Sequence, residues 1–522
     1  MIYDNQQSMK KYTIFILFIS IFLGQIGCKK FLDVKPLDKL SGNIFWASKA
    51  DAESFTSDLY AKLRGKLTST SFIPATGELR SGYIRATIAN NTNAAAEKNI
   101  RLVYEQFAVN NLMGGTGVLS TNAAWNGLGF SSITQWYDFY SVIQGANILY
   151  DRVDKGIPGL SAAETSQYKA EAAFIRCLTY FLMVRLYGDV PYYILPYQQD
   201  PLPRENFVSV LNKCIADLKP KANDLPLAFS DPALRAVRAT RGAALDLLMN
   251  MNMWNAGFDK ANKDKYYQET ADRGDELIKS NVYTLMPLEN FSEVMKGRST
   301  EGIFEFNQSI NYEPTAPNFR AFFGEIMLKY PNKATGGENN SSHGYFRADY
   351  LLRLYPTGIS DKRRDLWFDN FMLSQDGNFQ LLKFKGSLAS NVTGPSGIPE
   401  WDLIIFRYPD AILLRAEALA ELGQDGDAIK MLDMVRTRAI TPGYTGAGGQ
   451  PLKDAIFNER CKELMGEGYL YFDLIRTNRI LDPLWTLNPL TQDQFNRGGW
   501  TWPINSSALH NNPYMKLNEY WQ

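Results

Sequence analysis

The sequence predicts an all-α-dominated fold with irregular loops and a few short strands. Stretches in both halves of the chain carry apolar residues at helical spacing. Between them, residues 281–402 are rich in Gly, Asn, Pro and aromatic residues and show little helical periodicity. We therefore expect a helical scaffold over residues 40–280 and 403–480, interrupted by an irregular, loop-rich segment. Loops of that length inside a folded protein are usually functional.

The N-terminus has the pattern of a secretory signal. Two lysines precede an apolar run from Tyr12 to Leu23, and Cys28 follows a short stretch that ends in glycine. The run is about half of the roughly 20 residues that cross a bilayer, which favours a cleaved signal over a membrane span. We expect a lipoprotein signal peptide over residues 1–27, with lipid, including palmitate, attached to Cys28. Gln25 stands where Leu is usual in such signals, and secretion with an incidental cysteine is the alternative.

Helical patterns follow in order along the first half of the mature chain. The part from Ala170 to Tyr187 is apolar almost all round, which predicts a buried central helix. A glycine and then a proline, at Gly188 and Pro191, are typical of a helix end. The expected helices run from Asp51 to Leu63, Trp136 to Val153, Ala163 to Tyr187, Phe207 to Leu225 and Thr240 to Asn255.

A helical hairpin is predicted in the second half. Pro409 to Leu422 and Asp425 to Ala439 are separated by a short turn, so the two helices are expected to pack antiparallel. Their small and large residues follow the spacing of a tetratricopeptide hairpin. In the irregular segment, Leu381 to Phe384 is expected to form a short strand. The residues that carry the tetratricopeptide pattern are Ala416, Leu419, Ala428, Leu432, Val435 and Pro442.

The composition limits the classes of function. Lys and Arg equal Asp and Glu at 55 each, so the chain lacks the net positive charge that nucleic-acid binding requires. The chain also has 30 Phe, 28 Tyr and 10 Trp, a load that suits either a large core or flat amphipathic ligands such as sugars. Cys177, Cys214 and Cys461 each lie in an apolar helical pattern, which favours buried free thiols over disulfides or metal ligands.

Three carboxylates four residues apart are the strongest candidates for chemistry. Glu459, Glu463 and Glu467 fall on one helix face, as a hydrolase or a metal site would require. No histidine accompanies them, and His343 and His510 lie in unrelated loop-like contexts. Ion pairs explain the carboxylates better, so we expect no catalytic residue, no metal and no cofactor. The arginines available for such pairs are Arg460, Arg436, Arg438 and Arg476.

Aromatic and polar residues near turns are the candidates for ligand binding. A pyranose ring packs its C–H face on an aromatic ring, and its hydroxyl rim bonds to Asp, Glu, Asn and Arg side chains. Two regions combine these residue types outside helical patterns, one around residues 71–93 and one inside the irregular segment. The candidate ligand residues are Glu78, Arg80, Tyr83, Arg85, Trp125, Tyr312, Phe319 and Arg320.

Ordered motifs along the chain resemble those of the SusD-like (SusD/RagB) family of outer-membrane nutrient-binding lipoproteins. The most specific is Glu459 to Gly468, followed by Phe472 to Arg476, although Tyr469 stands where the family often has a basic residue. The other matching segments are Cys28 to Pro36, Ala170 to Pro191, Arg238 to Leu245, Asp361 to Arg364, Arg407 to Ala418, Trp502 to Ile504 and Asn512 to Tyr514.

The resemblance implies a single domain over residues 28–522, with tetratricopeptide-like hairpins as scaffold and a loop-rich half that binds ligand. It also implies a non-catalytic lipoprotein on the outer face of the outer membrane, which captures oligosaccharides and caps a TonB-dependent, SusC-like transporter. Two alternatives stay open. The same lid could serve peptides or glycoprotein-derived ligands, or a glycoside hydrolase could use a carboxylate pair from Glu459, Glu463, Glu467 or Asp473.

Overall fold

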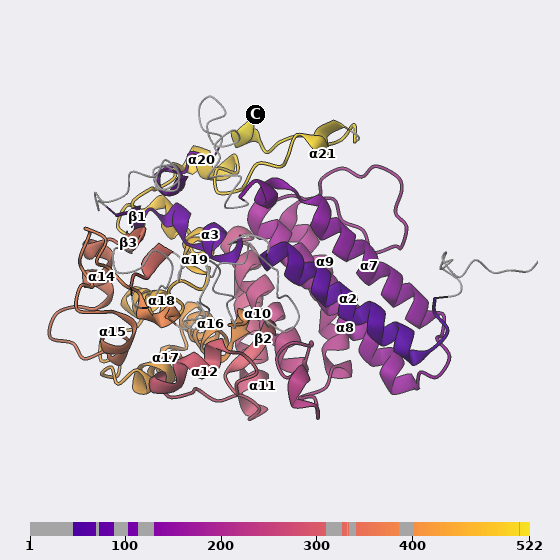
Figure 1. Cartoon of the computed structure of the whole chain (residues 1–522), viewed down its shortest axis with the longest axis horizontal. Helices are drawn as coiled ribbons and strands as arrows, with labels where there is room; N and C mark the ends of the chain where they lie inside the picture. Colours follow the sequence, from indigo (N-terminus) through magenta and orange to yellow (C-terminus); the bar gives the residue numbers. More distant parts are fainter. Residues whose placement is uncertain are drawn as a thin grey trace, which may run out of the picture.

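Helices form most of the protein in the computed structural model (Figure 1). The structure describes residues 45–68, 72–87, 103–112, 130–308, 326–330, 332, 341–385, 401–510 and 512–522. The expected signal peptide and Cys28 lie outside these residues. The long helices are α2 (Lys49–Thr68), α7 (Tyr137–Asp154), α8 (Ala162–Tyr187), α9 (Phe207–Leu218), α10 (Arg241–Phe258), α11 (Lys263–Lys279), α16 (Tyr408–Glu421), α17 (Asp425–Arg438) and α18 (Gln450–Glu463).

These long helices pack as a series of neighbours. Each contacts the next in chain order, from α2 through α7, α8, α9, α10 and α11 to α16, α17 and α18. In Figure 1, α2, α7, α8 and α9 form one half of the molecule, and α10, α11, α16 and α17 continue toward the other half. The helix-dominated fold predicted from the sequence is therefore confirmed. That these hairpins are tetratricopeptide repeats stays a prediction.

Helix α8 is the buried central helix that the sequence predicted. It begins with a capping box, in which the Ser161 side chain accepts from the Glu164 N–H and the Glu164 carboxylate accepts from the Ser161 N–H. It ends at Gly188, whose φ of 69° suits glycine. From Ala170 onward the helix is buried on nearly every side, so its few polar groups there need partners inside the protein.

Two expectations for local structure were wrong. The helix that begins at Phe207 ends at Leu218 and not at Leu225, because Pro220 supports only a 3₁₀ continuation over Lys219–Asp224. Leu381–Phe384 is not a strand: Leu381 forms one isolated bridge with Phe368, and Leu382–Phe384 is a 3₁₀ turn. The turn brings the Lys383 ammonium to the carbonyl oxygens of Glu463 and Met465, at 3.0 and 2.9 Å.

The irregular segment contributes short helices and strands. Strand β2 (Gly302–Phe306) pairs antiparallel with β4 (Leu403–Arg407), the strand that leads directly into α16. Strand β1 (Ile84–Ala86) pairs antiparallel with β3 (Gly344–Phe346). The short helices include α3 (Phe72–Gly77), α12 (Phe291–Met295), α14 (Ala348–Leu354), α15 (Lys362–Trp367), α19 (Leu470–Arg476), α20 (Gln492–Asn496) and α21 (Ser507–His510), and residues 103–108 are also helical.

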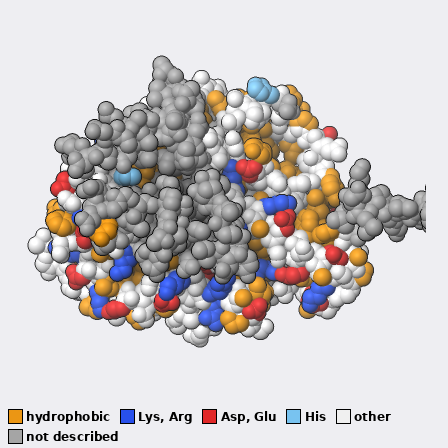
Figure 2. Space-filling model, viewed as in Figure 1, with side chains coloured by type: hydrophobic (Ala, Val, Ile, Leu, Met, Phe, Trp, Pro, Cys, Tyr) orange, Lys and Arg blue, Asp and Glu red, His pale blue; other side chains and the backbone are white. Residues whose placement is uncertain are grey.

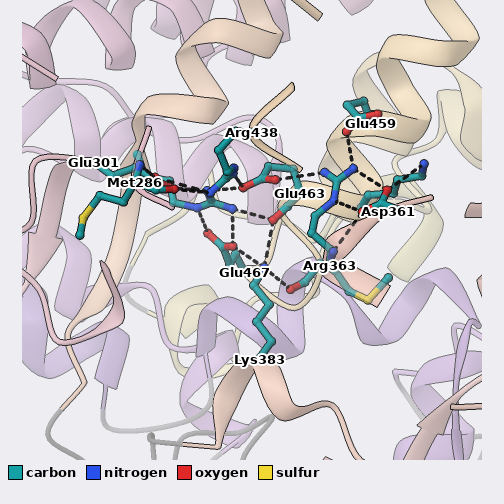
Figure 3. Close-up of polar contacts among 12 residues, drawn as sticks. Met286, Glu301, Asp361, Arg363, Lys383, Arg438, Glu459, Glu463 and Glu467 are labelled. Carbon is teal, nitrogen blue, oxygen red and sulfur yellow. Dashed lines mark hydrogen bonds and ion pairs between the residues drawn. The ribbon is translucent and has the colours of Figure 1, made fainter. Parts of the chain in front are cut away.

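A buried network of charges connects the irregular segment to the helices (Figure 3). At its centre Glu463, fully buried at the end of α18, accepts from Arg363 at 3.1 Å, from Arg407 at 2.6 Å and from Arg438. Arg407 Nε also donates to Glu467 Oε2 at 2.7 Å. These cations come from α15, β4 and α17, so one carboxylate joins three separate elements.

Further ion pairs in the network neutralise the other buried charges. Arg363 donates to Asp361 and Glu459 at 2.8 and 2.5 Å. Lys383 donates to Glu467 at 2.6 Å, and Arg407 to Glu301 at 2.9 Å. The ion pairs expected for Glu459, Glu463 and Glu467 are therefore present.

The cations that form these pairs differ in part from those expected. Of the four expected arginines, Arg438 alone pairs with one of the three glutamates in the described structure, and its partner is Glu463. Arg460 and Arg476 pair instead with Asp473, and Arg436 donates to the Pro442 carbonyl. The sequence placed these arginines near the glutamates along the chain, but packing directs them elsewhere.

The network sets the ionisation of its central carboxyl. Burial alone would raise the pKa of Glu463, but the guanidiniums of Arg438, Arg407 and Arg363 hold it well below its usual range. A carboxyl with a depressed pKa in the folded state stabilises the protein above its unfolded pKa, and that stability is lost as the pH falls. At neutral pH, the ionised network therefore connects the irregular segment to the helices.

We predict that Arg407→Met lowers the free energy of unfolding by about 3–5 kcal/mol, because it leaves buried carboxylates without their cation. Urea unfolding at pH 7 measures the change. Lys430→Met is the matched control, since Lys430 forms an exposed pair with Asp427 on α17 and its loss should cost within about 0.5 kcal/mol. Equal stability of the two variants would show that the network contributes nothing to the fold.

Candidate ligand-binding surface

The structure brings together the two regions in which the sequence predicted ligand residues. Strand β1 comes from the stretch 71–93, and β3 comes from the irregular segment 281–402. Their antiparallel pairing sets Arg85 opposite Tyr345, so both side chains lie on one face of the ribbon. Figure 1 shows β1 and β3 side by side at one end of the molecule, close to α14. We call this face the β1–β3 surface.

Partly exposed polar groups with planar heads lie on and beside the β1–β3 surface. The Arg85 guanidinium pairs with the Glu105 carboxylate, and these side chains are 30% and 34% exposed. Glu105 Oε1 also accepts from the Ala86 N–H at 3.1 Å, which fixes the carboxylate against β1. Arg347 and Asp349 form a second pair at 2.9 Å just after β3. Such groups can bond in pairs to the adjacent hydroxyls of a sugar.

The tyrosine expected to bind ligand is packed inside. Tyr83 is buried and stacks on Tyr350, with ring centroids 4.1 Å apart and an angle of 16° between the rings. The Arg353 guanidinium donates to Tyr83 Oη at 3.1 Å. The two stacked rings pack inside the protein, with Tyr83 directly before β1. Tyr83 therefore has almost no exposed face on which a sugar could lie.

Arg80 is likewise occupied by the protein. It is fully buried and donates to the carbonyl oxygens of Gly499 and Trp500 at 2.8 and 2.7 Å. Its Nε donates to Asn110 Oδ1 at 2.8 Å. Arg80 therefore satisfies the backbone of the C-terminal segment, as a buried irregular stretch requires.

Glu78 lies where the chain just after α3 packs closely against Gly468. It is buried, and its Oε1 accepts from the Gly468 N–H at 3.0 Å. A Cβ added at Gly77 would lie 1.9 Å from the Gly468 carbonyl oxygen, so no side chain fits at that position. Burial raises the pKa of Glu78 to about 8.

The ligand expectations are thus corrected for three residues and stay open for the others. The burial of Glu78, Arg80 and Tyr83 assigns them to structural contacts in this structure, and Arg85 alone of the described candidates lies at a surface. The sequence did not single out Glu105 or Tyr345, because their approach to Arg85 depends on the pairing of distant segments. The remaining candidates, Trp125, Tyr312, Phe319 and Arg320, lie outside the described residues.

Metal sites and membrane spans are not found in the described part of the chain. Within those ranges, His, Cys, Asp and Glu side chains form no group of three or more that could hold a metal ion. Cys177, Cys214 and Cys461 are buried free thiols, which confirms that expectation. No helix of the described chain has both the length and the apolar character needed to cross a bilayer.

Figure 2 shows acidic and basic side chains interspersed along the lower edge of the face in view.

Comparisons with known proteins match almost the whole chain. A model described as "SusD family" matches residues 376–521, and one described as "Starch-binding associating with outer membrane" matches residues 30–251. SusD-like protein P38 of Formosa agariphila is 27% identical over 562 residues, which cover 98% of this chain and 99% of the relative.

Solved structures agree with these matches. The crystal structure of a SusD homolog from Bacteroides thetaiotaomicron VPI-5482 is 35% identical, with a TM-score of 0.81, and covers 92% of this chain and 100% of its own. A laminarin-binding SusD-like protein is 18% identical, with a TM-score of 0.66, and covers 91% of this chain and 99% of its own. That second likeness shows a shared fold alone.

We predict that Glu78→Gln stabilises the protein increasingly as the pH rises. Because the pKa of Glu78 is raised in the folded state, the stability that this group contributes below pH 4.5 is lost as the pH rises through about 8. Glutamine keeps an oxygen for the Gly468 N–H and does not titrate. The variant's free energy of unfolding, relative to wild type, should rise by roughly 1 kcal/mol per pH unit between pH 5 and 8.

Urea unfolding at pH 5, 6.5 and 8 measures this difference. Glu293→Gln, which changes an exposed carboxyl paired with Lys296, is the control for the change of chemistry alone. A difference between Glu78→Gln and wild type that stays constant with pH would contradict the assignment of a buried, proton-binding carboxyl.

Proposed function

The chain belongs to the SusD family, and from that membership we propose that it is a non-catalytic surface lipoprotein that captures oligosaccharides for uptake. The observation that carries the proposal is the relative at 35% identity, which this chain matches over its full length. A glycan, laminarin, is the ligand of one of the solved neighbours with the same fold. The β1–β3 surface is the place that we propose for the ligand.

The chemistry of the β1–β3 surface supports a sugar ligand. The Arg85 guanidinium and the Glu105 carboxylate are held in one orientation by their pair and by the Ala86 N–H, so they offer a fixed donor and acceptor to a hydroxyl rim. Expected stacking on Trp125 and Tyr312 would add about 1–3 kcal/mol per ring. A site of this kind binds at micromolar to millimolar concentrations, which suits capture followed by release.

The proposal includes delivery to a partner. We propose that lipid on Cys28 tethers the protein to the outer face of the outer membrane, where it serves a TonB-dependent, SusC-like transporter. Multiple acyl chains contribute about 0.8 kcal/mol per buried methylene and so anchor durably. Tethering raises the effective concentration of the binding protein at its transporter without a tight interface.

The structure does not support the two alternative functions equally. A peptide or glycoprotein-derived ligand would use the same surface, and no contact in the described structure separates it from a glycan. A glycoside hydrolase has little support, because the carboxylates that suggested it are buried in ion pairs. Glu463 is held by three arginines, and Asp473 by Arg460 and Arg476.

We predict that Arg85→Ala weakens glycan binding by tenfold or more, because it removes a charged hydrogen-bond donor and frees Glu105 from its fixed position. Calorimetric titration of the purified chain from residue 29 onward with a panel of glycans, laminarin included, measures the affinities. Trp125→Ala and Tyr312→Ala test the expected stacking residues in the same assay. Lys430→Ala, far from any proposed contact, is the control.

The outcomes separate the candidate functions. A ligand whose affinity falls in Arg85→Ala but not in Lys430→Ala supports the β1–β3 surface. Failure of every glycan together with binding of peptides would favour the peptide alternative. Release of shorter sugars during the titration would overturn the non-catalytic assignment.

We predict that Cys28→Ala abolishes incorporation of labelled palmitate when the full precursor is expressed in a Gram-negative host, because the acyl acceptor is gone. The protein should then move from the membrane fraction to the soluble fraction. Cys177→Ala is the matched control, since this thiol is buried in the fold. Palmitate label retained in Cys28→Ala would show that the lipid is attached to another residue.

A further inference from the structure

A polar cleft of about 340 Å³ lies on the helical scaffold. The cleft lies where the end of α10, the start of α11, the end of α16, the start of α18 and the end of α19 meet. It shares no lining residue with the β1–β3 surface. Its volume is at the lower end of the roughly 300–1,000 Å³ of small-molecule sites. None of the residues that line it took part in the function proposed above.

Two of the three acidic side chains in the cleft wall are already paired, and the third, Asp482, is exposed and accepts from the Leu484 N–H at 2.8 Å. Glu417 accepts from Arg476, through Nη1 and, at 2.8 Å, through Nη2. Glu421 accepts from Lys453 Nζ at 2.8 Å. These two carboxylates therefore have their charge compensated by the protein and do not call for a cationic ligand.

The basic side chains in the cleft wall are only partly paired. In the described chain, neither Lys260 nor Lys263 has a carboxylate within ion-pair distance, although both line the cleft. Burial and the nearby charge of Lys263 lower the pKa of Lys260, and the charge of Glu421 opposes this by raising it. Arg479 donates to Asp454 at 2.5 Å, but its Nε is buried without a partner.

Two helices begin at the cleft without a side-chain cap. Lys263 is the first residue of α11 and Gln450 the first of α18, and in neither helix does the side chain of the N-cap residue accept a hydrogen bond from the first turn. The positive end of a helix dipole favours an anion. The helix dipoles and the lysines therefore both favour an anionic ligand in the cleft.

Neutral polar groups in the wall suit hydroxyl groups. Neither the Tyr267 hydroxyl nor the Asn478 side-chain amide forms a hydrogen bond with any other described side chain or backbone group, and both line the cleft. Asn478 adopts a left-handed φ of 57° at the end of α19, a conformation that asparagine tolerates better than most residues. An amide and a phenol beside positive charges can bind a ligand that carries both hydroxyls and an anionic group.

We propose that this cleft is a second saccharide site, which binds the carboxylate of an acidic sugar such as a uronic acid through Lys260 and Lys263. The assignment rests on the proposed glycan function and adds a substrate class to it. The Tyr267 hydroxyl and the Asn478 amide bind the hydroxyl groups of the same sugar residue. The β1–β3 surface does not take part.

The test compares trigalacturonate with its fully methyl-esterified form, which has the same skeleton and no charge. Calorimetric titration at low salt should show binding of the acid and at least tenfold weaker binding of the ester. Lys260→Met combined with Lys263→Met should weaken binding of the acid about tenfold, because two ammonium contacts are lost. Lys279→Met combined with Lys430→Met is the control, since it removes the same charge from exposed lysines outside the cleft.

Each outcome decides the proposal. Equal affinity for the acid and the ester, equal loss in both double variants, or absence of trigalacturonate binding would overturn it. Binding of inorganic sulfate as tight as that of trigalacturonate would overturn the saccharide assignment. If a neutral glycan binds and depends on Arg85 while trigalacturonate fails, the proposed function stands and this inference alone falls.

Discussion

The buried charge network around Glu463 is the constraint on which the rest of the structure depends. Burying an unpaired carboxylate is costly, so Arg363, Arg407 and Arg438 must reach it from α15, β4 and α17 at the same time. Lys383 and Glu467 extend the requirement to the turn at Leu382–Phe384. An irregular segment with few helices and strands of its own is thereby fixed to a helical scaffold through ion pairs as well as apolar packing.

This attachment has a consequence for the candidate site. Strand β3 and the helix α14 after it belong to the irregular segment, while β1 follows the short helix α3 of the N-terminal part. Glu78 and Arg80 tie that part to Gly468 and to the C-terminal segment. Arg85, which pairs with Glu105, therefore lies on a ribbon whose two strands are each attached to the rest of the fold. A ligand that binds there meets a surface whose orientation is set in advance, which lowers the entropy lost on binding.

The parts of the fold that follow from local pattern could be predicted from the sequence. The apolar surface of α8, its glycine end and the helix face shared by Glu459 and Glu463 are properties of neighbouring residues, and the structure contains them. The expectation that Glu467 lies on the same helix face was wrong, because α18 ends at Glu463 and Glu467 follows in a turn. The partners Arg363, Arg407 and Lys383 lie about 50 to 100 residues from these glutamates, beyond the reach of spacing arguments. Glu78, Arg80 and Tyr83 have the residue types of a sugar site, but sequence alone cannot distinguish a polar group that faces solvent from one that satisfies a buried backbone.

The central claim is that a glycan binds on the β1–β3 surface of a scaffold that does not alter it. Hydrogen–deuterium exchange of the protein, with and without a saturating glycan that it binds, tests this claim most directly. We expect slower exchange in Ile84–Ala86, around Glu105 and in Gly344–Phe346, with the glycan recovered intact. Unchanged exchange in these segments, or recovery of a cleaved glycan, would contradict the claim.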